Sequence, residues 1–173
     1  MRTYEAKAYT FDELSDQAKD AAKQDYFSGA GYSWSEDALA SLKAFAEAFD
    51  AKLSDYQIDW FNCTYSSAEF SAPEMSRREV GRRLRALGTY DKKTLRGHGE
   101  CKLTGYCSDE DALDGMRKAY FAGESDLGEL LQEGFWSWLK AAQADAEYQY
   151  SDEAFSESCK ANDYEFDESG HML

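Results

Sequence analysis

The side chains best suited to metal binding or covalent chemistry are four cysteines and two histidines. A structural zinc site usually takes its ligands from closely spaced pairs of Cys or His. Around His98, Cys101 and Cys107 the spacing matches neither a Cys-x-x-Cys pair nor a Cys–His finger. We therefore expect no metal site and no cofactor, and we interpret the thiols as reduced and buried: Cys63, Cys101, Cys107 and Cys159.

Catalytic motifs are absent from the sequence. It contains no G-x-S-x-G turn, no phosphate-binding P-loop and no dinucleotide-binding glycine pattern. Its 34 carboxylates are so numerous that a pair of them does not identify an acid–base couple. We expect that the protein has no catalytic residues, is not an enzyme, and acts by binding another macromolecule.

Charge is the strongest feature of the chain, and it is unevenly distributed. The 34 acidic and 19 basic residues give a net charge of −15. Residues 1–75 carry −8, residues 76–108 carry +6 and residues 109–173 carry −13, so a basic segment at about 76–102 lies between two acidic blocks. Such a charge attracts basic surfaces and repels nucleic acids and membranes.

Carboxylates recur every four residues on two predicted helices. Asp12, Asp16 and Asp20 form one row, and Glu129 and Glu133 form another. Four helical residues rise about 6 Å, which is comparable with the spacing of phosphates along a DNA strand. These rows either form solvated faces or bind the basic groove of a nucleic-acid-binding protein. We predict the second role, because solubility alone needs only about 2–8 net charges in a small domain.

Trp136 falls on the same predicted helix face as Glu129 and Glu133, whereas Trp138 faces inward. A tryptophan exposed among charges is typical of an interface anchor. The alternative is that another element covers it. We predict that Trp136 binds the partner together with the two acidic rows.

The basic segment is a second candidate site. Arg78, Arg82 and Arg85 share one face of a predicted helix, and Lys92 follows in a loop. Such a row can follow the phosphates of a nucleic acid. The flanking acidic blocks would repel the same polyanion over a Debye length of about 8–10 Å. The arginines could instead pair with the protein's own carboxylates, within one chain or across a homodimer.

Hydrophobic periodicity and capping residues predict the elements that carry these side chains. Strands are predicted over 3–9, 55–62, 65–72 and 100–107, and a strand–turn–strand over 163–173. Helices are predicted to begin after these caps: Thr10 or Ser15, Ser33 or Ser35, Ser76, Ser108, Ser125 and Ser151. Core residues of the second helix are predicted to be Leu42, Phe45 and Phe49.

These elements predict a single α+β domain over residues 1–173, with a small, mostly antiparallel sheet packed against several helices. No apolar run reaches the about 18–20 residues that span a bilayer. The segment MRTYEAKAYTFDEL also contains no apolar signal-peptide region. We expect a cytoplasmic protein that does not bind membranes.

Three segments carry a resemblance to a known family: FDELSDQAKDAA at 11–22, LTGYCSDEDALDG at 103–115 and NDYEFDESG at 162–170. Together and in this order they resemble a family of short, uncharacterised acidic proteins encoded by bacteriophages and prophages. That family supplies no catalytic residue that could be assigned here. The resemblance implies a protein of the host bacterial cytoplasm, similar in character to phage anti-CRISPR and antirestriction inhibitors.

The functional hypothesis combines charge and resemblance. We expect a phage-encoded inhibitor of a bacterial defence system that binds a nucleic-acid-handling protein, such as a CRISPR effector complex, through its acidic surface and blocks engagement of DNA or RNA. The alternative is a phage regulatory or nucleic-acid-binding protein that uses the arginine-rich segment 77–96.

Overall fold

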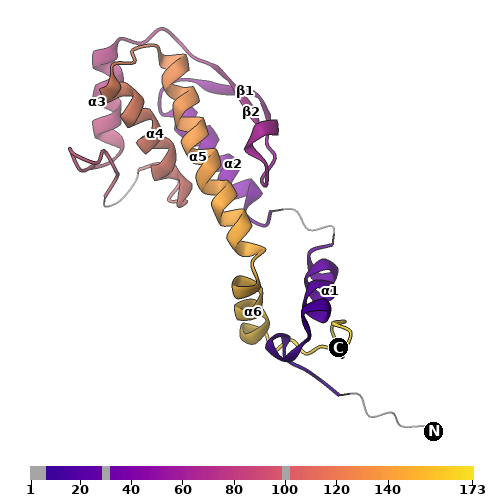
Figure 1. Cartoon of the computed structure of the whole chain (residues 1–173). Helices are drawn as coiled ribbons and strands as arrows, with labels where there is room; N and C mark the ends of the chain where they lie inside the picture. The colour runs from indigo at the N-terminus through magenta and orange to yellow at the C-terminus, as the bar shows by residue number, and fades with distance from the viewer. Residues whose placement is uncertain (1–6, 29–31, 99–101) are drawn as a thin grey trace. The chain divides into compact units, whose positions relative to one another are not determined.

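A computed structural model describes residues 7–28, 32–98 and 102–173 of the chain (Figure 1). The described residues form helices and a two-stranded antiparallel sheet, which confirms the α+β class. The elements are α1 (Asp16–Phe27), α2 (Ser35–Glu47), β1 (Lys52–Gln57), β2 (Ser67–Ser71), α3 (Arg77–Leu87), α4 (Ser108–Ala122), α5 (Leu127–Gln149) and α6 (Asp152–Ala161), with short 3-10 turns at Phe11–Glu13 and Cys63–Tyr65.

The chain divides into two compact units, and the division falls within α5. Unit 1 comprises Met1–Ser33 and Asp145–Leu173, and unit 2 comprises Trp34–Ala144. The expectation of a single domain over the whole chain stays a prediction. Each unit has its own buried side chains and is described by itself.

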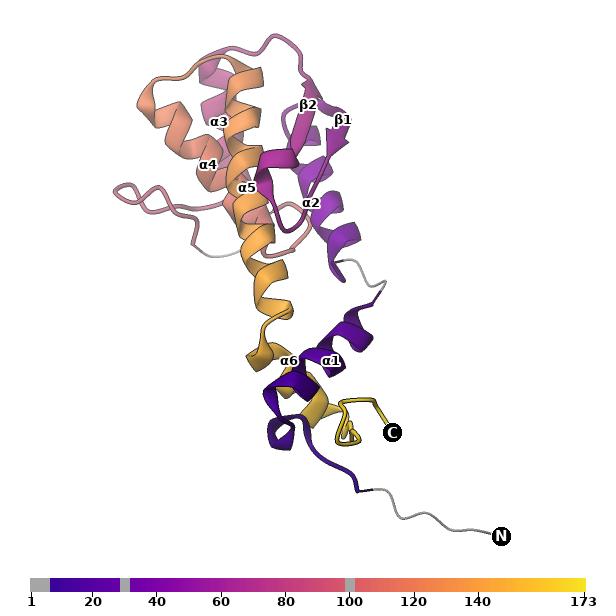
Figure 2. The same cartoon turned by 45° about the vertical axis from the view of Figure 1, so that its right-hand side comes forward.

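The core of unit 2 is built from the apolar faces of α2, α4 and α5. Phe45 of α2 and Phe49, two residues after the end of α2, are fully buried, and so are Phe135 and Trp138 of α5. These side chains recur at helical spacing, so burying them places one face of each helix inside. Figures 1 and 2 show α4 and α5 side by side in this unit. The predicted core residues Leu42, Phe45 and Phe49 are confirmed.

The strands predicted over 55–62 and 65–72 form an antiparallel pair, although the first begins and ends earlier than predicted. Lys52 of β1 lies opposite Ser71 of β2, and Gln57 lies opposite Ser67 at the other end of the pair. The register shifts between Leu53 and Asp55. The Asp59 carboxylate accepts hydrogen bonds from the backbone N–H groups of Phe61 and Asn62. This local turn takes backbone donors that a longer strand would need, so the first strand stops before the predicted residue 62.

Unit 1 packs α1, α6 and the C-terminal segment around a smaller core. Its buried cluster contains Phe11, Phe155 and Phe166, and Phe11 meets Phe155 edge to face with ring centroids 4.8 Å apart. Phe166 forms isolated antiparallel bridges to Tyr9 and to Met172. The strand–turn–strand predicted over 163–173 is therefore present as isolated bridges and not as extended strands. Of the strand predicted over 3–9, residues 3–6 lie outside the described residues.

Of the two caps predicted for the first helix, Ser15 is confirmed: its side chain accepts from Ala18 N, α1 begins at Asp16, and Thr10 precedes the 3-10 turn. The strand predicted over 100–107 is wrong for the described residues 102–107, which form bends and a turn. There the buried Asp109 carboxylate accepts hydrogen bonds from the backbone N–H groups of Thr104 and Gly105, which folds this segment back onto α4.

The remaining predicted caps have mixed outcomes. α2 begins at Ser35 with Trp34 at its cap position and no side-chain cap hydrogen bond, so the cap predicted at Ser33 or Ser35 is wrong. Ser76 and Ser151 accept backbone hydrogen bonds in the first turns of α3 and α6, as predicted. Ser108 is itself the first residue of α4, and Cys107 occupies the cap position. At the start of α5, the Asp126 carboxylate accepts from Glu129 N at 3.0 Å, so Asp126 takes the role that was predicted for Ser125.

Replacing Phe49 with alanine tests the placement of the unit 2 core. Phe49→Ala should lower the free energy of unfolding by about 3–5 kcal/mol, because it removes a fully buried ring and leaves a cavity. Lys43→Ala, at an exposed position of α2, should change it by less than about 0.5 kcal/mol. Urea unfolding followed by circular dichroism measures both values. A loss below about 1 kcal/mol for Phe49→Ala would show that this site is not a packed core position.

Candidate partner-binding site

A groove of about 710 Å³ lies between α4 and α5 in unit 2. Glu129, Glu133 and Trp136 line it from α5, Lys118 lines it from α4, and Glu124 lines it from the connection between them. The two helices are joined by only a few residues, so the last turns of α4 face the first turns of α5. The structure thus brings together the second predicted acidic row and the predicted anchor.

Close helix packing forms the floor of this groove. A Cβ atom at Gly115 of α4 would lie 2.6 Å from the backbone oxygen of Glu133 and 2.5 Å from Cβ of Ser137 on α5. On α5, a Cβ atom at Gly134 would lie 3.0 Å from the backbone oxygen of Ala112 on α4. These glycines let the two backbones approach closely, so the charged side chains above Gly115 border a shared depression.

Trp136 is half-buried in this groove. Its ring centroid is 4.9 Å from that of the buried Phe135, whereas Trp138 is completely buried, as the helical spacing predicts. Glu129, Glu133 and Lys140 are exposed around it. An indole held on one side and accessible on the other can bury the rest of its apolar surface against a partner. Whether it does so stays a prediction.

Sequence reasoning missed Lys118 and Glu124 as part of this groove. Lys118 belongs to a separate helix, and Glu124 lies in the connection, where its carboxylate accepts hydrogen bonds from the backbone N–H groups of Ser125 and Asp126. These bonds lower the pKa of Glu124 and keep its carboxylate charged. The short connection could have indicated that α4 and α5 are antiparallel neighbours, and therefore that these residues meet Glu129 and Glu133.

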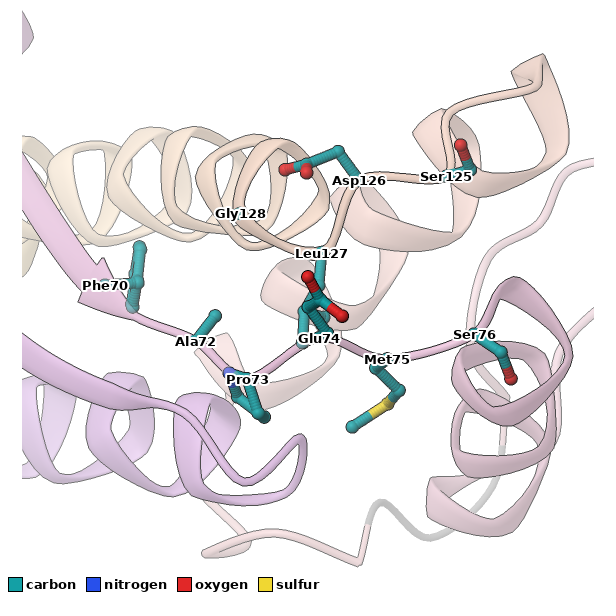
Figure 3. A pocket seen from close by; sticks show the side chains of 10 residues that line it. All are labelled: Phe70, Ala72, Pro73, Glu74, Met75, Ser76, Ser125, Asp126, Leu127 and Gly128. Atoms are coloured by element: carbon teal, nitrogen blue, oxygen red, sulfur yellow. The ribbon is translucent and has the colours of Figure 1, made fainter.

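A second depression, of about 690 Å³, lies where the segment before α3 passes the start of α5 (Figure 3). Glu74 and Asp126 supply its carboxylates, and Phe70, Met75 and Leu127 supply apolar surface. Asp126 already caps α5. This pocket was not predicted, because its walls come from segments about fifty residues apart in the chain.

The first predicted acidic row does not form as expected. Asp12 lies in the 3-10 turn, outside the helix that carries Asp16 and Asp20. Its carboxylate accepts a hydrogen bond from Ser156 at 2.7 Å and pairs with Lys160 at 2.6 Å. The bonds from Lys160 and Ser156 lower the pKa of Asp12. The Asp12 carboxylate is therefore engaged in contacts within unit 1. Asp16 and Asp20 are exposed and lie four residues apart on α1.

The predicted basic row separates into paired and unpaired arginines. Arg82 donates to Glu79 at 2.8 Å and 2.5 Å, so this arginine pairs with the protein's own carboxylate. Arg78, Arg85 and Lys92 are exposed and make no ion pair within the described parts of the chain.

Two other arginines of the segment are engaged as well. Arg83 pairs with Asp50 at 2.5 Å and with Glu79 at 3.1 Å. Arg77 donates to the backbone oxygens of Glu124 and Tyr120, and its guanidinium lies 4.3 Å from the Tyr120 ring centroid. Arg77, Arg82 and Arg83 therefore use their positive charge in internal contacts.

The cysteines and histidines that the structure describes form no metal-binding cluster. Within residues 7–28, 32–98 and 102–173, no group of three or more His, Cys, Asp or Glu side chains is arranged to hold a metal ion. The Cys63 thiol is partly buried and contacts the Gln143 side chain, Cys107 is exposed and Cys159 is buried. The expectation of buried thiols is therefore confirmed for Cys159, wrong for Cys107 and met only in part for Cys63. Cys101 lies outside the described residues, and His98 is exposed in a loop.

No helix in the described chain combines the length and the apolar character that a bilayer-spanning segment needs. Comparisons with protein-family models, with curated protein sequences and with solved structures found no match.

Adding a methyl group at Gly115 tests the close approach of α4 and α5. Gly115→Ala should lower the free energy of unfolding by about 1–3 kcal/mol, because the new Cβ would press on the backbone of Glu133. Gly128→Ala is the matched control, since its Cβ would meet only the Asp126 carboxylate at 3.1 Å. The control should be neutral or stabilising by up to about 1 kcal/mol, owing to higher helix propensity. Equal effects in urea unfolding would contradict this packing.

The Glu79 carboxylate makes a prediction about acid stability. Hydrogen bonds from Arg82 and Arg83 lower the pKa of Glu79 from 4.5 to about 2. Because its pKa is lower in the folded state, Glu79 stabilises the fold fully above pH 4.5, and this contribution is lost as the pH falls toward about 2. The Tm deficit of Glu79→Gln should therefore shrink across that interval.

The matched control for this measurement is Glu69→Gln, which removes an exposed carboxylate that has no ion pair among the described residues. Glu69→Gln should not reproduce the pH-dependent Tm deficit expected for Glu79→Gln, because it removes no contact with an arginine among the described residues. A Glu79→Gln deficit that does not change with pH would refute the role of the arginine contacts.

Proposed function

We propose that the protein binds a basic, nucleic-acid-handling protein through its acidic surface and competes with the DNA or RNA of that partner. The observation that carries this proposal is the groove in which Glu129 and Glu133 flank the half-buried Trp136. Carboxylates beside an accessible indole suit a Lys- or Arg-containing segment, because they offer ion pairs and cation–π contact together.

Net charge supports this proposal at longer range. Unit 1 contains 15 acidic and 5 basic residues, a net charge of −10, within a total of −15 for the chain. A field of this sign accelerates encounter with a basic surface and opposes encounter with free nucleic acid. Exposed carboxylates such as Asp16 and Asp20 contribute to the field without needing a contact of their own.

The proposed setting is a bacterial cell infected by a phage. The resemblance to acidic phage proteins suggests an inhibitor of a host defence system, with a CRISPR effector complex as one target of suitable chemistry. Such effectors hold nucleic acid in positively charged channels. A rigid acidic protein can occupy a channel of that kind without being cleaved or modified, so this function needs no catalytic residue.

A second function is favoured by one observation, the exposure of Arg78, Arg85 and Lys92 without ion pairs among the described residues. These side chains could contact phosphates directly, as in a regulatory nucleic-acid-binding protein. Arg82 would have to leave Glu79 to join them. The surrounding negative charge makes this the weaker of the two proposals.

Neutralising the groove carboxylates tests the proposed function. The partner is first isolated by co-purification from bacteria that carry several defence systems, and binding kinetics are then measured by surface plasmon resonance. Glu129→Gln with Glu133→Gln should lower the association rate, by an amount that shrinks as salt rises. Glu36→Gln with Glu47→Gln, at exposed positions of α2, is the matched control for the same change in net charge.

Trp136→Ala should act on the other rate constant. Loss of an anchor raises the dissociation rate at every salt concentration, on the order of tenfold or more. The discriminating variant replaces Arg78, Arg82 and Arg85 with alanine. If that triple variant loses partner binding while the groove variants keep it, acidic binding is wrong and the basic segment is the site.

A further inference from the structure

Unit 1 contains a small pocket of about 230 Å³. None of its lining residues belongs to the groove between α4 and α5. The 3-10 turn Phe11–Glu13 forms one wall, α6 forms another, and the residues after α6 form the third. The volume is below the about 300–1,000 Å³ of typical small-molecule sites. It suits a single side chain rather than a cofactor or a drug-sized ligand.

The interior of this pocket is apolar. Phe11 and Cys159 are each 3% exposed, and the partly buried Tyr164 packs against the same cluster. Burial raises the pKa of the Cys159 thiol, so the sulfur stays protonated and uncharged at neutral pH. Aromatic rings and an uncharged thiol favour an apolar occupant.

The rim of the pocket is acidic. Asp12 is neutralised by its ion pair with Lys160 at 2.6 Å, and Ser156 completes its hydrogen bonding. Asp163 and Glu165 also line the pocket, are exposed, and make no ion pair within the described chain. The charge that remains at the rim is therefore negative, in the unit that carries −10.

Contacts between distant parts of the chain hold the walls in place. Tyr9 and Phe166 exchange two backbone hydrogen bonds of 2.9 Å. The ion pair from Asp12 to Lys160 joins the 3-10 turn to α6. A pocket whose walls are fixed in this way loses little conformational freedom when it is filled, which favours binding.

From this geometry we propose that the pocket binds one apolar side chain of a partner segment, flanked there by lysine or arginine. Charge complementarity selects this occupant: the apolar side chain fills the pocket, while its basic neighbours face Asp163 and Glu165. The inference rests on the proposed function for the identity of the partner, but the pocket and its chemistry belong to unit 1 alone. It adds a second contact surface to the groove between α4 and α5.

Short peptides test this inference directly on the full-length protein. The first probe has one phenylalanine between two Lys-Arg pairs, the second replaces the phenylalanine with serine, and the third replaces the basic residues with glutamate. Two-dimensional ¹H–¹⁵N NMR titrations locate and quantify binding. The first peptide should shift the amide signals of Phe11, Ser156 and Cys159, and it should bind at least about tenfold more tightly than the other two.

A rim variant and a matched control complete the test. Asp163→Asn with Glu165→Gln should weaken the first peptide severalfold, and less so in high salt. Asparagine suits position 163, because this residue has a φ of 53°. Asp25→Asn with Glu153→Gln makes the same charge change at exposed positions of unit 1 outside the pocket, and should leave binding within about twofold.

The outcomes are distinguishable from those for the proposed function, because the peptides require no host partner. Equal binding of the phenylalanine and serine peptides, shifts confined to other surfaces, or equal effects of the rim and control variants would each overturn the pocket assignment. Any of these results would leave the groove-dependent partner binding standing. Selective peptide binding at Phe11 and Cys159 would support the pocket even if no nucleic-acid-handling partner were found.

Discussion

The close packing of α5 against α4 is the constraint on which unit 2 and its candidate site depend. Gly115 and Gly134 remove side chains where the two backbones approach, and Gly134 also makes room for Phe45 of α2. One face of α5 therefore packs into the core, where Phe135 and Trp138 are fully buried. The opposite face must then carry the charged residues, and the short connection sets the α4 residues beside them.

Local sequence signals predicted much of the helical structure, because periodicity and caps act over a few residues. The stripe from Leu42 to Phe49 is buried, and Ser76 and Ser151 cap the helices that follow them. The failures come from competition between nearby polar groups. Asp126, rather than the predicted Ser125, caps α5, and Asp109 folds back the described residues 102–107, where a strand was predicted. No propensity rule weighs such competitors against each other.

The candidate site was predictable only in part, for a related reason. Glu129, Glu133 and Trp136 lie on one face of one helix, so spacing alone groups them. Asp12 does not share the helix face of Asp16 and Asp20, because the Ser15 cap starts α1 at Asp16 and leaves Asp12 in the 3-10 turn. There its carboxylate pairs with Lys160, a residue far away in the chain. Arg77, Arg82 and Arg83 likewise have internal partners, whereas Arg78 and Arg85 make no ion pair among the described residues. The chain as a whole keeps a strongly negative net charge of −15.

The central claim, that this acidic surface competes with nucleic acid for a basic partner, is tested most directly by displacement. Fluorescence anisotropy of labelled DNA or RNA bound to the isolated partner would be followed as the protein is added. The account predicts that the anisotropy falls to the value of free nucleic acid, and that the midpoint moves to higher protein concentration as the nucleic acid concentration is raised. Anisotropy that rises instead, through a ternary complex or through direct binding of this protein to the nucleic acid, would contradict it.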